Sequence, residues 1–154
     1  MKSLFFLLVI LCSLLNGKVL APNKNLLAEK LLINNKEREY YLLDNNEYIV
    51  QGPSVISVYA RMALPKKQKY TELFSININL ENINETSSIL NISKTFNKKK
   101  DSRVSSLYHP MHNYTESGKV EVNIPNGKFK FIIENDGFFS KPVLLRIIQK
   151  KIDV

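Results

Sequence analysis

The sequence predicts an all-β protein, an antiparallel β-sandwich of the jelly-roll or immunoglobulin-like type, preceded by a cleaved signal peptide. From Arg38 to the C-terminus, apolar and polar residues alternate with a period of two, the pattern of half-buried strands. Turn-forming Asn, Gly and Pro residues separate these alternating runs. Short strands punctuated by turns, without convincing helices between them, are typical of sandwiches.

The first 17 residues have the features of a secretory signal peptide. Lys2 precedes an apolar run from Leu4 to Leu15, which is the expected order of charge and hydrophobic segment. A membrane-spanning helix needs about 20 apolar residues, and this run stops at Asn16. We therefore expect cleavage after Gly17, or as late as Ala21, and a secreted or periplasmic protein with no transmembrane span. A retained membrane anchor is the alternative.

The cysteine content fits a fold held together by packing alone. The chain has a single cysteine, Cys12, and it lies within the signal segment. Although export permits disulfides, the mature protein has none to form, and a thiol mechanism is excluded.

Residues 18–37 form a lead-in to the predicted sandwich domain, which spans residues 38–154. Leu26, Leu27, Leu31 and Leu32 are spaced as on a short helix. The pattern ends at Asn34–Asn35 before a stable helix could form, so the conformation of this segment stays open.

Two strands are clearest in the middle of the chain, over Ile56–Met62 and Phe74–Leu80, and a last strand is expected over Pro142–Lys151. In each strand the apolar residues occupy alternate positions. Gln51–Gly52–Pro53 is interpreted as a bend between strands. Weaker strands are expected at Arg38–Leu43, Tyr48–Val50, Ile89–Ser93 and Val104–Tyr108.

The strongest local signal predicts a hairpin between Lys119 and Glu134. Asn126–Gly127 is a preferred centre of a two-residue type I′ turn. Counting outward from that turn places Ile124 opposite Phe129 and Val122 opposite Phe131, with all the apolar pairs on one face.

The mature chain is basic. Without Lys2 it has 21 basic and 14 acidic residues, a net charge of +7. A positive net charge favours anionic partners, which outside the cytoplasm are envelope surfaces and acidic polymers rather than nucleic acid. The alternative is that the charge only keeps the protein soluble. The candidate binding patch consists of Lys66, Lys67, Lys69, Lys98, Lys99, Lys100 and Arg103, with the aromatic pair Phe138 and Phe139 as a further contact.

The two histidines and a methionine lie close together, at His109, Met111 and His112. This combination could bind copper or zinc, with Asp101 or Glu116 as a third ligand. No catalytic motif accompanies it, so we expect no cofactor and no enzyme activity; a metal-binding protein or a small hydrolase using both histidines is the alternative.

Together these observations predict an exported, non-catalytic binding domain. Its expected partner is a protein, a glycan or an anionic envelope surface. A structural or assembly-linked role in the cell envelope is the second hypothesis, and the oligomeric state stays open.

Overall fold

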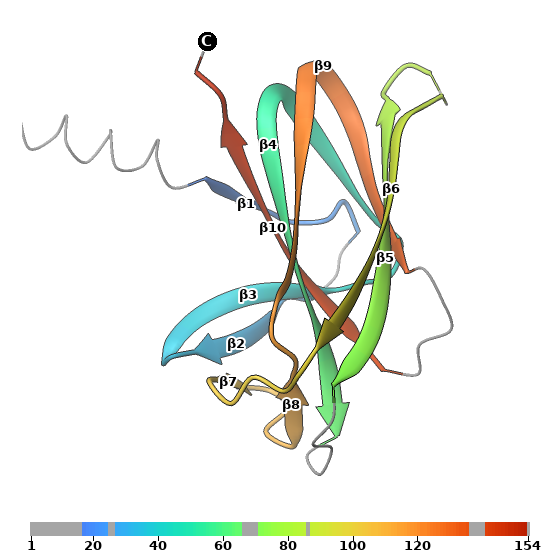
Figure 1. Cartoon of the computed structure of the whole chain (residues 1–154). Coiled ribbons are helices and arrows are strands. Elements are labelled where there is room, and N and C mark those ends of the chain that lie inside the picture. Colours follow the sequence, from blue (N-terminus) through green and yellow to red (C-terminus); the bar gives the residue numbers. More distant parts are fainter. Residues whose placement is uncertain (1–16, 25–26, 66–70, 86, 136–140, 154) are drawn as a thin grey trace, which may run out of the picture.

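The computed structural model describes residues 17–24, 27–65, 71–85, 87–135 and 141–153. They form one open ten-stranded sheet in which the neighbouring strands pair antiparallel (Figure 1). The predicted all-β, antiparallel class is therefore confirmed. The expected signal peptide spans residues 1–17, of which residues 1–16 lie outside the described part. Among the described residues, no helix is long and apolar enough to cross a membrane.

The strands follow one another along the chain with few residues between most of them. Their bounds are β1 Lys18–Leu20, β2 Glu29–Ile33, β3 Lys36–Leu42, β4 Asn46–Pro65, β5 Glu72–Asn82, β6 Ser88–Lys98, β7 Val104–Ser106, β8 His112–Tyr114, β9 Gly118–Asn135 and β10 Val143–Lys151. The order across the sheet is β6-β5-β9-β4-β10-β3-β2-β7, with β1 paired to β10 and β8 to β4. Four of the predicted strands lie within β4, β5 and β6, which are longer than expected. The predicted strands at Arg38–Leu43, Val104–Tyr108 and Pro142–Lys151 overlap β3, β7 and β10 but each extends beyond one end of the observed strand.

The predicted hairpin at Asn126–Gly127 is wrong. Residues on both sides of this dipeptide belong to the single strand β9, which pairs with β4 from Gly118 to Ile124 and again from Gly127 to Ile133. Phe129 is opposite Val50 and Ile124 is opposite Ser54, so the two residues expected to face each other pair with another strand instead.

Asn126–Gly127 forms a shared bend rather than a turn between two strands. Gly52 of β4 lies opposite Gly127, and both strands arch over together at this level (Figure 1). A Cβ atom on Gly52 would lie 1.7 Å from the carbonyl oxygen of Pro125, so only glycine lets the two backbones approach this closely. Gly127 has a φ of 125°, a conformation that favours glycine.

A two-residue hairpin does occur, but in the lead-in. Asn34 and Asn35 have φ values of 50° and 61° and join β2 to β3, with Ile33 opposite Lys36. Positive φ at both central residues defines the type I′ turn, which asparagine tolerates. The helix-like spacing of Leu31 and Leu32 therefore belongs to a strand.

The core lies on one face of the folded sheet, and the predicted alternation identifies it correctly. Ile56, Val58, Ala60 and Met62 of β4 are buried, as are alternate residues from Phe74 to Leu80 in β5. Residues before and after the bend in β4 and β9 contribute to the same cluster. The opposite face of β4 is consequently left for other contacts.

Part of that opposite face is also covered. A smaller cluster packs Leu31 and Tyr40 of the β2–β3 hairpin against Ala63 and Leu144, with Val104 and Tyr114. The hairpin therefore stands over one end of β4 and β10 and leaves the rest of this face accessible.

Candidate functional site

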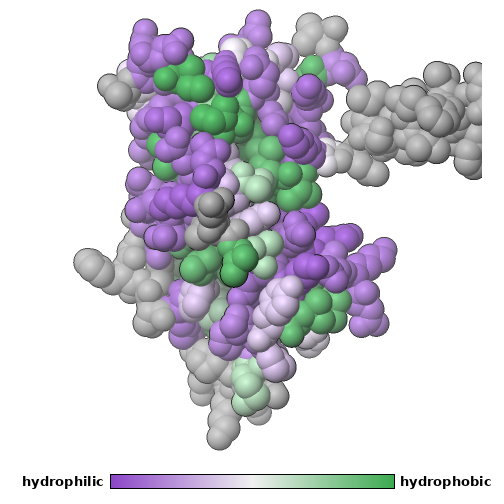
Figure 2. All heavy atoms as spheres, turned by 180° about the vertical axis from the view of Figure 1, so that it is seen from behind, coloured by the Kyte–Doolittle hydropathy of each residue, from purple (hydrophilic) through white to green (hydrophobic). Residues whose placement is uncertain are grey.

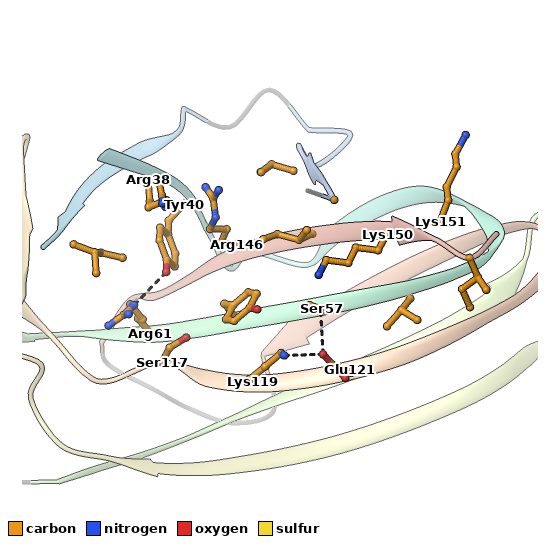
Figure 3. A pocket seen from close by; sticks show the side chains of 17 residues that line it. Arg38, Tyr40, Ser57, Arg61, Ser117, Lys119, Glu121, Arg146, Lys150 and Lys151 are labelled. Atoms are coloured by element: carbon orange, nitrogen blue, oxygen red, sulfur yellow. Dashed lines mark hydrogen bonds and ion pairs between the residues drawn. The ribbon is translucent and has the colours of Figure 1, made fainter. Parts of the chain in front are cut away.

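A groove of about 1110 Å³ lies on the face of β4, β9 and β10 that points away from the main core. Figure 3 shows side chains from these strands and from β3 directed into it, whereas Lys151, at the end of β10, extends away from the others. The basic residues that line it are Arg38, Arg61, Lys119, Arg146, Lys150 and Lys151, and the acidic one is Glu121. The groove is therefore a strongly positive concavity.

Strand register explains how these side chains meet. Tyr59 of β4 lies between Lys119 of β9 and Arg146 of β10, and Ser57 lies between Glu121 and Ile148. Because side chains in a strand alternate between faces, positions two apart on neighbouring strands form rows across one face. The rows place one aromatic ring among several charges.

Two of the cations in the groove are already neutralised. Lys119 Nζ lies 2.6 Å from Glu121 Oε1 and 5.6 Å from the centre of the Tyr59 ring. The ammonium of Lys119 lowers the pKa of Glu121, and the Glu121 carboxylate raises the pKa of Lys119. Arg61 is bound to the buried carboxylate of Asp101 at 3.0 Å.

The remaining four cations keep their charge available. In the described part of the chain, Arg38, Arg146, Lys150 and Lys151 form no ion pair with a carboxylate. Partial burial lowers the pKa of Arg146 and the charge of Arg38 lowers it further, while the charges of Tyr40, Glu39 and Tyr59 act in the opposite direction. An anion entering the groove would relieve this repulsion.

The basic patch expected from the sequence does not coincide with this groove. Lys98, Lys99, Lys100 and Arg103 are described, but none of them lines it. Arg103 is bound to Asp101 at 2.9 Å and Lys99 lies 3.9 Å from Glu116. Lys66, Lys67, Lys69, Phe138 and Phe139 lie outside the described residues.

A second pocket, of about 760 Å³, contains the two histidines. Their rings are stacked with centroids 5.0 Å apart, and His109 Nε2 lies 2.8 Å from Glu29 Oε1. Within the described residues, no three His, Cys, Asp or Glu side chains are arranged to hold a metal ion. Asp101, one of the expected third ligands, instead binds two arginines, and Met111 is exposed.

The exterior behind the view of Figure 1 is mainly polar. Figure 2 shows hydrophilic residues over most of this face, with apolar residues in separate patches. Scattered apolar residues are ordinary on protein surfaces, so these patches do not by themselves mark a binding site.

The sequence contained a signal for the groove, but an incomplete one. Ser57, Tyr59 and Arg61 occupy the non-core positions of a predicted strand, and Arg146 does so in the last one. Only the pairing of β4 with both β9 and β10 shows that these positions share a face.

No family model matches the chain, and no curated protein is detectably similar to it in sequence.

Proposed function

We propose that this protein is an exported, non-catalytic β-sandwich domain that binds an anionic component of the cell envelope in the groove formed by β3, β4, β9 and β10. This proposal rests mainly on four cations in one concavity, Arg38, Arg146, Lys150 and Lys151, which pair with no carboxylate among the described residues. Charged groups that line a cleft focus the field and attract ligands of opposite sign.

The shape of the folded sheet supports the sandwich interpretation. Both β4 and β9 arch over at their shared bend, and residues from both arms of each strand enter the same core. Two arms that hide their apolar faces against each other act as the two layers of a sandwich.

The geometry favours recognition of the ligand's charges over stacking on sugar rings. Tyr59 is covered by the Lys119 ammonium, and Tyr40 is buried. The chain has no tryptophan. An extended polyanion, such as an acidic envelope polymer, would place successive charges beside Arg146 and Lys150.

The test is binding of the purified protein to an immobilised sulfated polysaccharide at increasing salt. Replacing Lys150 and Lys151 by Gln should weaken binding roughly tenfold or more, since each lysine near an anionic surface contributes about 1 kcal/mol. Binding should also weaken as salt screens the charges.

The matched control is the double variant Lys94→Gln, Lys128→Gln. Both lysines are exposed and lie outside the groove, and the change in net charge is the same. Equal losses in the two variants would show that net charge alone attracts the polymer, and absence of binding at low salt would refute the proposed function.

A further inference from the structure

Arg38 and Arg146 lie together at one end of the groove. Arg146 is on β10 and Arg38 is on β3, two residues before Tyr40. Figure 3 shows both side chains beside Tyr40, on the same side of the groove. Burial lowers the pKa of Arg146 most, the charge of Arg38 lowers it further and the charge of Glu39 raises it, so the two guanidinium groups act on each other electrostatically.

Backbone contacts fix both guanidinium groups without neutralising them. Arg38 Nη1 donates to the carbonyl oxygen of Glu37, and Arg146 Nη1 donates to that of Glu39, each at 3.1 Å. A guanidinium has five N–H donors in a rigid fork, so each group retains further donors for a ligand. Arg146 is partly buried, which strengthens its interaction with an incoming anion.

We propose that Arg38 and Arg146 form the subsite for a terminal phosphate group of the anionic ligand, an inference that rests on the proposed function. A phosphate monoester carries a charge of about −1.5 to −2 at pH 7 and three acceptor oxygens. It can therefore satisfy two arginine forks at once. A sulfate ester, a carboxylate or a phosphodiester brings a single negative charge and leaves one of the two guanidinium charges uncompensated.

The rest of the groove fits the group that carries the phosphate. Tyr59 lies directly across from Arg146 in the β4–β10 register, and Val55 lies opposite Lys150. The phosphate-bearing residue would thus lie over β4 between the positions of Tyr59 and Val55, and Lys150 would meet the next charge along.

The charge state of the phosphate predicts a specific pH dependence of the binding affinity. Among the described residues, those that line the groove include no histidine; the titratable and charged groups that line it are arginines, lysines, tyrosines and Glu121. The carboxylate of Glu39 also acts on Arg146, and an ordinary glutamate titrates below pH 5. Lysine, arginine and tyrosine do not titrate between pH 5 and 7.5, and the neighbouring Lys119 lowers the pKa of Glu121. The second pKa of a phosphate monoester lies near 6, so affinity should rise through this range.

The experiment compares glucose 6-phosphate with glucose 6-sulfate by titration calorimetry at pH 5 and pH 7.5. We expect the phosphate to bind roughly tenfold tighter at pH 7.5, and this preference to shrink at pH 5. Inorganic phosphate and phosphatidylcholine vesicles containing phosphatidate, run in parallel, identify the free ion or a lipid headgroup as the source. Equal affinity for the two sugar esters at both pH values would overturn the phosphate subsite.

Arg38→Gln and Arg146→Gln should each reduce the affinity for glucose 6-phosphate at least tenfold. Arg146→Lys should also weaken it, because lysine keeps the charge but loses the fork. Lys94→Gln is the control, and circular dichroism verifies folding. If the arginine variants fail to fold, the affinities of the unchanged protein for the two sugar esters still test the phosphate subsite. Polymer binding that depends on Lys150 and Lys151 without any phosphate preference would refute this subsite and leave the proposed function standing.

Discussion

Asp101 joins two arginines that come from distant parts of the chain. Its side chain is 3% exposed, and its carboxylate lies 3.0 Å from Arg61 of β4 and 2.9 Å from Arg103. Hydrogen bonds from Arg103, and then those from Arg61, lower the pKa of Asp101 from 3.8 to about 2 despite its burial. Arg61 also donates to the Tyr40 hydroxyl at 3.2 Å and to the Thr115 carbonyl at 2.9 Å. The network therefore ties the segment before β7 to the centre of the sheet.

This network should make the protein sensitive to acid. The unfolded carboxyl, with its ordinary pKa, takes up a proton before the folded one does, so protonation favours the unfolded chain. The contribution of Asp101 to the free energy of unfolding should be fully present above about pH 5. It should decrease by about 2 kcal/mol as the pH falls toward 2. Urea denaturation of the purified protein across this range measures the effect.

Asp101→Asn provides the comparison. We expect this variant to be less stable at pH 7 by about 3–5 kcal/mol, because it leaves the buried Arg61 uncompensated, and to lack this part of the acid dependence. A parallel loss of stability in both proteins below pH 4 would show that other carboxylates are responsible.

At the level of elements, β4 and β9 form one long ribbon that bends at a single point. The peptide bond between Gly52 and Pro53 is cis, the β4–β9 register shifts between Gly52 and Ser54, and Pro125 packs against Gly52. Both strands need special residues at the same level, because a bend in one strand breaks the ladder unless its partner follows.

Gly52→Ala should disrupt this bend. The new methyl group would overlap the carbonyl oxygen of Pro125, a backbone atom that cannot turn aside. We expect a loss of about 3 kcal/mol, the upper end of the cost of overpacking, measured by urea denaturation. Gln51→Ala, at an exposed neighbouring position, is the control and should change stability by less than about 0.5 kcal/mol. An unchanged midpoint for Gly52→Ala would mean that the two backbones can separate without cost.

Local patterns predicted which face of a strand is buried but not which strands are neighbours. Alternation placed Ile56 and Phe74 correctly in the core, because it depends only on the residues of one strand. The Asn126–Gly127 hairpin failed because its turn preference was outweighed by pairing with β4, more than 60 residues away in sequence. The groove was missed for the same reason: Lys119, Tyr59 and Arg146 meet only through long-range pairing.

For the whole molecule, the sheet separates two tasks. One face buries the apolar residues that stabilise the fold, and the other presents the basic groove. The first strand, β1, belongs to this arrangement, because it pairs with β10 and its Leu20 enters the main core.

The position of β1 distinguishes the two expected cleavage sites. Cleavage after Gly17 keeps β1, whereas cleavage after Ala21 removes it. If the protein is exported as proposed, mass spectrometry of its mature form should find Lys18 as the first residue. A chain that starts at Pro22 should be less stable by roughly 2–3 kcal/mol, since it loses a buried leucine. A mature N-terminus at Pro22 with undiminished stability would contradict this prediction.

The pairing of Lys18 with Gln149 brings the first and last described strands to the same rim, where Val19, Lys151 and Ile152 border the groove. Anything fused at either extremity emerges beside the groove's mouth, at an effective concentration that reaches the millimolar range for a short flexible tether. An affinity tag rich in Asp or Glu would consequently bind the groove of its own chain and block it, whereas a neutral tag would leave the groove accessible.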